Sequence, residues 1–173
     1  SEGFDDSCET KVILSARPGG PVAQVHSAAV DSGQGLATVL VQVARTELGI
    51  ADVTLHETDT EVGSSGSSSA SRQTVMSSGA LQLACDAIRE ELFQRARASR
   101  GLDGAALSLE GGRVLADGLP VGVIEEFLGA PITAGRVFHH RKTQPLDEWG
   151  QGDVHPFFAF VAERAVVDVD VDL

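Results

Sequence analysis

The stretch at 20–57, GPVAQVHSAAVDSGQGLATVLVQVARTELGIADVTLHE, carries the pattern that decides the fold. The apolar run at 20–30 predicts a strand, and the small residues at 31–35 interrupt it. The segment that follows predicts a helix of about three or four turns, because apolar residues recur at helical spacing: Leu36, Val39, Leu40 and Val43. Gly49 is suited to end this helix, and 51–57 again predicts a strand. The stretch therefore indicates a β–α–β unit.

Further strand and helix patterns lie on both sides of this unit. Residues 8–16 predict a strand that a Pro-Gly-Gly turn joins to the next one, and a helix rich in alanine is predicted over 75–99. The other predicted elements are short strands within 104–116, a short helix from Pro120 to Leu128, and strands at 131–140 and 156–173 separated by a loop at 142–153. Since strands and helices do not alternate strictly, we predict an α+β fold with a mixed β-sheet and packed helices.

The charge of the 173-residue chain restricts its partners. The formal net charge is −12, from 25 acidic and 13 basic residues, and such a surface repels the phosphates of nucleic acids. An anionic cofactor would therefore be held by backbone N–H groups and helix ends. No apolar run is long enough to cross a membrane and no signal peptide is visible, so we expect a cytoplasmic protein without a membrane partner.

The metal-ligating residue types do not form a predicted metal site. Cys8 and Cys85 are too few for an iron–sulfur cluster, and Cys85 is expected to pack within its helix. The histidines are scattered, and the neighbours His139 and His140 would point to opposite faces of a strand. The alternating aspartates at 168–172 lack the glycine and terminal glutamate of a calcium loop.

Two loops of small residues each lead into a predicted helix. Gly33-Gln34-Gly35 precedes the first helix, and residues 64–74 (SSGSSSASRQT) precede the long one, with Ser69 and Ser71 as N-cap candidates. Unpaired N–H groups of a first helical turn, together with the helix dipole, suit a phosphate or a polar heterocycle. The alternatives are a tight strand-to-helix turn for the first loop and a plain Ser/Gly linker for the second.

These loops resemble those of a known family, the molybdenum hydroxylases of the xanthine dehydrogenase and aldehyde oxidase type. The string AVDSGQG at 29–35, followed by VLVQVARTELGI, is similar to the family's Gly-Gln-Gly loop, helix and Q-x-A-x-x-L-G segment. Asp59-Thr60 and GSSGSSSASRQTVMSSGAL are similar to its acidic–Thr pair, Gly/Ser loop and A-S-R-x-T stretch. Residues 1–7 and 154–173 also resemble family segments, whereas 101–153 fit weakly.

The resemblance implies an internal segment of the molybdopterin-binding large subunit. Residues 1–100 would form the βαβ core and the cofactor loops, 101–153 a variable, insertion-like region, and 154–173 a strand that continues beyond the segment. The cofactor-binding residues that it implies lie in the two loops: Gly33, Gln34, Gly35, Ser69, Ala70, Ser71, Arg72, Gln73 and Thr74. No catalytic residue is assigned, because the family's glutamate belongs to a Gly-Glu-Pro-type motif that this sequence lacks.

The same resemblance implies a function for the intact enzyme. Molybdopterin, or its cytosine dinucleotide form, would carry molybdenum, and a heteroaromatic (purine-like) or aldehyde carbon would be hydroxylated with oxygen from water. The expected partners are the remainder of the molybdenum subunit and the domains or subunits that carry 2Fe-2S clusters and FAD, in an oligomeric enzyme. The alternative is a non-catalytic assembly module, or one without cofactor. A nucleotide-binding domain is disfavoured, because GxGxxG and GxxxxGK[ST] are absent.

Overall fold

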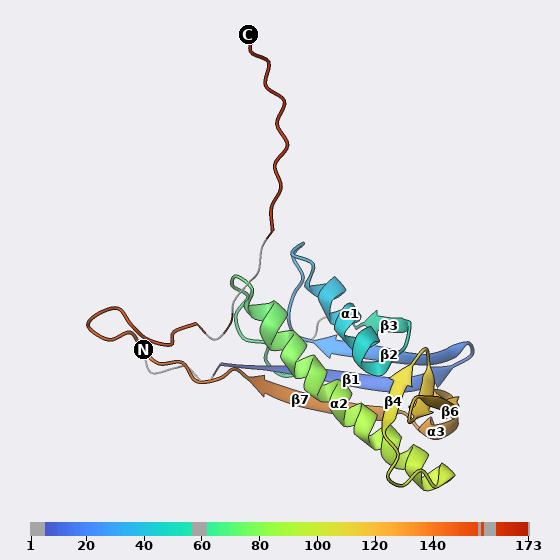
Figure 1. The fold of residues 1–173 in the computed structure, drawn as a ribbon. Coiled ribbons are helices and arrows are strands. Elements are labelled where there is room, and N and C mark those ends of the chain that lie inside the picture. The colour runs from blue at the N-terminus through green and yellow to red at the C-terminus, as the bar shows by residue number, and fades with distance from the viewer. Residues whose placement is uncertain (1–5, 57–61, 156, 158–161, 173) are drawn as a thin grey trace. The chain divides into compact units, whose positions relative to one another are not determined.

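A computed structural model of the chain describes residues 6–56, 62–155, 157 and 162–172 (Figure 1). It divides into two compact units, one that extends to His140 and one that contains the residues from Arg141 onward. All the helices and strands described below belong to the first unit.

The centre of the first unit is a four-stranded mixed sheet with the strand order β3-β2-β1-β7. Its strands are β1 (Ser7–Arg17), β2 (Gly20–Ser27), β3 (Asp52–Leu55) and β7 (Ile132–His139). β1 pairs antiparallel with both β2 and β7, whereas β2 pairs parallel with β3. The predicted β–α–β unit and the predicted α+β class with a mixed sheet are therefore confirmed.

Two helices, α1 (Leu36–Leu48) and α2 (Arg72–Arg100), pack side by side on this sheet (Figure 1). Gly49 ends α1 with φ 62, as its position predicted, since this backbone conformation suits glycine. Gly79 lets α2 approach β7 closely, because a Cβ at this position would lie 2.8 Å from the ring of Phe138. The largest fully buried side chains between the helices and the sheet include Val12, Leu14, Val25, Leu40, Leu48, Leu81, Ile88 and Leu92.

A second, three-stranded sheet comprises β4 (Leu107–Glu110), β5 (Arg113–Ala116) and β6 (Leu119–Val123), and is followed by α3 (Ile124–Leu128). The helix predicted from Pro120 to Leu128 ends where expected, but its predicted start at Pro120 is wrong. Pro120 lies opposite Leu115 in the β5–β6 ladder, next to a register irregularity, and proline is tolerated in strands at such positions. The helix itself begins four residues later.

The strand predicted over 156–173 does not form in the part of that segment that the structure describes. Residues 162–170 have no assigned helix or strand, and the valines between 166 and 171 are 74–86% exposed. A strand requires a hydrogen-bonded neighbour, and alternating valine and aspartate alone does not provide one. Among the described residues, no helix is both long and apolar enough to cross a membrane.

Candidate functional site

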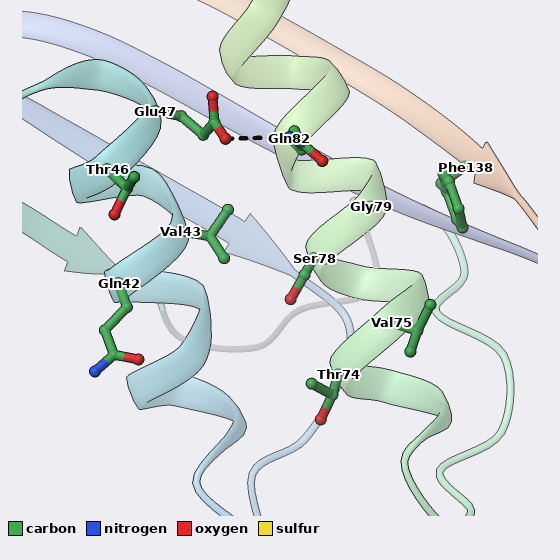
Figure 2. Close-up of a pocket in the computed structure, with 10 residues that line it drawn as sticks. All are labelled: Gln42, Val43, Thr46, Glu47, Thr74, Val75, Ser78, Gly79, Gln82 and Phe138. Carbon is green, nitrogen blue, oxygen red and sulfur yellow. Dashed lines mark hydrogen bonds between the residues drawn. The ribbon is translucent and has the colours of Figure 1, made fainter. Parts of the chain in front are cut away.

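The two helices that follow the small-residue loops run in the same direction. Gln42 of α1 and Thr74 of α2 line one end of a shared groove, and Glu47 and Gln82 line the other end, where Gln82 Nε2 donates to Glu47 Oε1 at 3.1 Å (Figure 2). Residue numbers therefore increase together along both helices. Their N-termini lie at the same end of the pair, and so do the two loops that precede them.

The groove between these helices is open and has a volume of about 460 Å³. Its wall is largely uncharged, with Glu47 as the one ionisable residue in the set that lines it: Gln42, Val43, Thr46, Glu47, Thr74, Val75, Ser78, Gly79, Gln82 and Phe138. Thr74 is the one predicted cofactor-binding residue among them. The groove therefore begins at the first turn of α2, next to the second loop, and continues between the two helices.

The first loop is closed by the carboxylate of Asp31. This group accepts the backbone N–H groups of Gly33 at 3.0 Å, Gly35 at 3.2 Å and Ala37 at 2.8 Å. The hydrogen bond from Ala37, followed by that from Gly33, lowers the pKa of Asp31 below its usual value. The prediction that these N–H groups are unpaired is wrong, because a carboxylate within the same loop occupies them.

The side chain of Gln34 is also bonded within its own loop. Its Oε1 accepts the backbone N–H of Ser32 at 2.7 Å, and its Nε2 donates to the carbonyl of Val30 at 3.0 Å. Gly33 and Gly35 have positive φ values of 112 and 84, and a Cβ at either position would meet no atom within 4 Å. The backbone of this loop is therefore open to solvent on the side where the two glycines lack side chains.

The second loop is organised by Arg72, the first residue of α2. Its guanidinium forms a two-pronged ion pair with Asp6, with 2.8 Å between Nε and Oδ2, and donates to the carbonyl of Ser7 at 3.2 Å. This hydrogen-bonded pair lowers the pKa of the Asp6 carboxyl and raises that of Arg72. Arg72 Nη1 also donates to the carbonyls of Ser65 and Ser67, at 2.7 and 2.8 Å.

Gln73 lies directly beneath the same loop and is 4% exposed. Its Nε2 donates to the carbonyls of Ser65 and Ser67, both at 3.0 Å, and its Oε1 accepts the Ser77 hydroxyl at 2.6 Å. The Ser77 hydroxyl lies 3.3 Å from the buried Cys8 sulfur of β1. The side chains of Arg72 and Gln73 thus bind the protein itself, whereas the sequence placed both residues among the cofactor contacts.

The other predicted residues of the second loop are exposed. Ser69, Ala70, Ser71 and Thr74 all face solvent. Ala70 has φ 46, a left-handed conformation that is uncommon for a residue with a side chain. Ser71 takes the N-cap position of α2, as predicted for one of the two serines, but its hydroxyl forms no capping hydrogen bond. These residues can present backbone N–H groups and hydroxyls, and no positive side chain, to a ligand.

The structure brings the two loops to one end of a helix pair, and no hydrogen bond between described residues joins them directly. The residues that the sequence interpretation missed are Asp31, Asp6, Ser65 and Ser67. Asp31 could have been recognised, because an aspartate two residues before a glycine is typical of a side chain that caps its own turn. Asp6 is 66 residues from Arg72, so no local pattern indicates their ion pair.

The described histidines and cysteines form no metal centre. The rings of His26 and His56, at the ends of the parallel strands β2 and β3, stack with their centroids 4.4 Å apart. No group of three or more described His, Cys, Asp or Glu residues is arranged to hold a metal ion. Cys85 is fully buried in α2, and burial raises the pKa of its thiol to about 12, in line with its predicted packing role.

Comparisons with known proteins identify the family and the fold of the chain. Residues 3–173 match the family described as "Molybdopterin cofactor-binding domain". A search of curated proteins gave no match. The fold is similar to that of quinoline 2-oxidoreductase from Pseudomonas putida 86, with 25% identity and a TM-score of 0.65 over 76% of this chain and 19% of that chain.

Two further solved structures share the fold. A Cu,Mo-CO dehydrogenase has 21% identity and a TM-score of 0.55 over 75% of this chain and 18% of its own. A reconstituted CO dehydrogenase from Oligotropha carboxidovorans has 23% identity and a TM-score of 0.54 over the same shares. The chain thus spans about a fifth of the length of these relatives. It belongs to the family of molybdopterin cofactor-binding domains found in the molybdenum hydroxylases.

Proposed function

We propose that the chain forms one wall of a molybdopterin site, with its two small-residue loops facing the same cofactor. The observation that carries this proposal is the common direction of α1 and α2, which places both loops at one end of the helix pair. The N-terminus of each helix carries about half a positive charge, so two such ends favour an anion between them. This suits a chain whose loop cation, Arg72, is already paired with Asp6.

The residues present fit such a group through their backbone. Gly33 and Gly35 leave open space where side chains would stand, and Ser69, Ala70 and Ser71 are exposed at the start of α2. Of the nine predicted residues, seven are proposed to face the cofactor: Gly33, Gln34, Gly35, Ser69, Ala70, Ser71 and Thr74. The other two, Arg72 and Gln73, hold the second loop from beneath through their hydrogen bonds to its carbonyls. When bound, the molybdenum–pterin group supplies the two-electron oxidation, and this chain contributes binding and orientation.

The intact protein is proposed to be an oxidoreductase of the xanthine dehydrogenase and aldehyde oxidase type. Its substrate would be a heteroaromatic compound or an aldehyde, hydroxylated with oxygen from water in a cytoplasmic enzyme. The name of one relative, quinoline 2-oxidoreductase, supports the heteroaromatic class. The partners would be the rest of the molybdenum subunit and the domains or subunits that hold 2Fe-2S clusters and FAD.

One observation favours a second candidate, a module of the same fold that assists assembly and holds no cofactor. The carboxylate of Asp31 already occupies three N–H groups of the first loop, so an anion cannot bind them unless the carboxylate moves away. Under this alternative, the closed loop would be a structural turn.

The test uses Gly35→Val in the intact molybdenum subunit, with Gly118→Val as the matched control. Gly35 and Gly118 have φ values of 84 and 82, and neither has an atom within 4 Å of an added Cβ. Both variants therefore carry the same backbone strain, but only the first fills the proposed site. We expect Gly35→Val to lower the molybdenum and pterin content per subunit several-fold and Gly118→Val to leave it unchanged. Contents equal to those of the unaltered subunit in both variants would contradict contact of the first loop with the cofactor, and an unaltered subunit without molybdopterin would favour the assembly module.

A further inference from the structure

We propose that Arg72 and Gln73 act as positioning residues for the second loop, an inference that rests on the proposed function. Their side chains hold the carbonyls of Ser65 and Ser67 against the protein. The backbone N–H of Ser68 is thereby turned outward, where it donates to an oxygen of the bound molybdopterin. We refer to the four hydrogen bonds from Arg72 and Gln73 to these two carbonyls as the carbonyl clamp.

The carbonyl clamp is symmetrical in its donors. Each of the two carbonyl oxygens accepts one hydrogen bond from Arg72 Nη1 and one from Gln73 Nε2, at distances between 2.7 and 3.0 Å. A carbonyl oxygen has two lone pairs, so both oxygens are fully satisfied from the protein side. They are therefore not available to a ligand.

The residues of the clamp are themselves held in place. The guanidinium of Arg72 is fixed by Asp6, and its side chain is 13% exposed. The carboxamide of Gln73 is fixed by Ser77, which contacts Cys8 in β1. Both side chains are thus anchored to the strand below, and neither has a donor directed toward solvent in the described contacts.

The planarity of the peptide unit determines which backbone groups face outward. In a trans peptide, the carbonyl of one residue and the N–H of the next point in opposite directions, and no cis peptide occurs in the described chain. The inward carbonyl of Ser65 therefore directs the N–H of Gly66 outward, where it donates to Ser64 Oγ at 3.1 Å. The inward carbonyl of Ser67 directs the N–H of Ser68 outward, and Ser68 is exposed. Among the described residues, no acceptor binds this N–H.

Gly66 provides the space that this arrangement needs. A Cβ at Gly66 would lie 2.5 Å from Arg72 Nη2, so a side chain there would displace the guanidinium. Gly66 therefore leaves room for the guanidinium of the carbonyl clamp, and Ser68, two positions later, faces the ligand.

The first experiment measures the role of Ser68 in the intact subunit purified with its cofactor. Ser68→Pro removes the N–H, whereas Ser68→Ala keeps it and removes the hydroxyl. We expect the proline variant to lose molybdopterin about tenfold, as for one lost hydrogen bond to a charged group, and the alanine variant to retain it. Full retention by Ser68→Pro, or an equal loss in both variants, would overturn the proposal.

The second experiment tests the clamp with Arg72→Lys and Gln73→Glu. Arg89→Lys is the control, because Arg89 lies on the same helix and pairs with Glu47, away from the loop. Both clamp variants should lose cofactor and show faster amide hydrogen exchange over residues 64–71, and the control should show neither change. Cofactor loss without faster exchange would instead indicate direct contact with the ligand and would contradict a positioning role.

These outcomes separate the clamp from the proposed function. If the unaltered subunit contains no molybdopterin, the proposed function fails, whereas the exchange measurement still reports on the clamp. If the unaltered subunit contains molybdopterin and the clamp variants keep both their cofactor and their exchange rates, the clamp fails and the proposed function stands.

Discussion

Asp31 shows how much of a loop can depend on one side chain. Its carboxylate accepts three backbone N–H groups at the start of α1, and these hydrogen bonds hold its pKa below the usual value. A carboxyl with a lowered pKa in the folded state stabilises that state at pH values above its ordinary pKa. The stabilisation is lost as the pH falls through the lowered pKa.

We therefore expect Asp31→Ala to lower the melting temperature at pH 7. In strong acid, where the carboxyl of Asp31 is protonated, the variant and the unaltered protein should have the same melting temperature. The amides of Gly33, Gly35 and Ala37 should exchange faster in this variant. The control is Asp103→Ala, because Asp103 is exposed and forms no hydrogen bond with the described residues. A melting temperature that decreases equally in both variants at pH 7 would contradict the role of Asp31.

At the scale of single residues, the sequence indicated where the loops lie but not what their side chains contact. The position of Gly33-Gln34-Gly35 directly before α1 was predicted correctly, and the two glycines have positive φ values there, a conformation that glycine adopts readily. The roles of Arg72 and Gln73 were not, because their partners come from β1 and from the preceding loop, in an arrangement set by tertiary packing. Whether any of the nine residues contacts the cofactor stays a prediction.

At the scale of elements, two helix-ending glycines provide a matched comparison. Gly49 and Gly101 follow α1 and α2 with φ values of 62 and 65. A Cβ at Gly49 would lie 2.7 Å from the backbone of Leu109, whereas a Cβ at Gly101 would meet no atom within 4 Å. The two positions therefore share the backbone strain of a substitution and differ in steric contact.

We expect Gly101→Ala to lower the free energy of unfolding by about 1 kcal/mol, the cost of a left-handed conformation for a residue with a side chain. Gly49→Ala should cost about 1–3 kcal/mol more, because the backbone of β4 must move. Urea denaturation of both variants measures the difference. An equal decrease in the free energy of unfolding of the two variants would show that β4 can move without a loss of stability.

Elements whose apolar side chains pack into the core of the first unit were predicted correctly, whereas the start of α3 and the strand expected after residue 156 were not. The β–α–β unit and the long helix follow from apolar spacing, and burial of the same residues confirms it. Proline is tolerated both in a first helical turn and in an irregular strand, so the local preference of Pro120 could not distinguish the start of a helix from a strand. The valine and aspartate alternation after residue 166 has strand periodicity without a strand partner in the described chain.

At the scale of the whole molecule, the core belongs to the unit that ends at His140. The buried apolar residues of the described chain lie between Cys8 and Ala134. We therefore expect a chain that ends at His140 to unfold cooperatively, with a melting temperature close to that of the 173-residue chain, as measured by circular dichroism. A large decrease would show that residues 141–173 contribute to stability.

The common direction of α1 and α2 has an electrostatic consequence for the whole domain. Neighbouring helices that run the same way bring like partial charges together at both ends, and this repulsion opposes their packing. At the amino-terminal end, the carboxylate of Asp31 offsets part of this repulsion at α1, and a negative ligand near the start of α2 would offset more of it. A bound anion should therefore raise the melting temperature of the domain. The repulsion that destabilises the unliganded protein is also what favours binding of the anion.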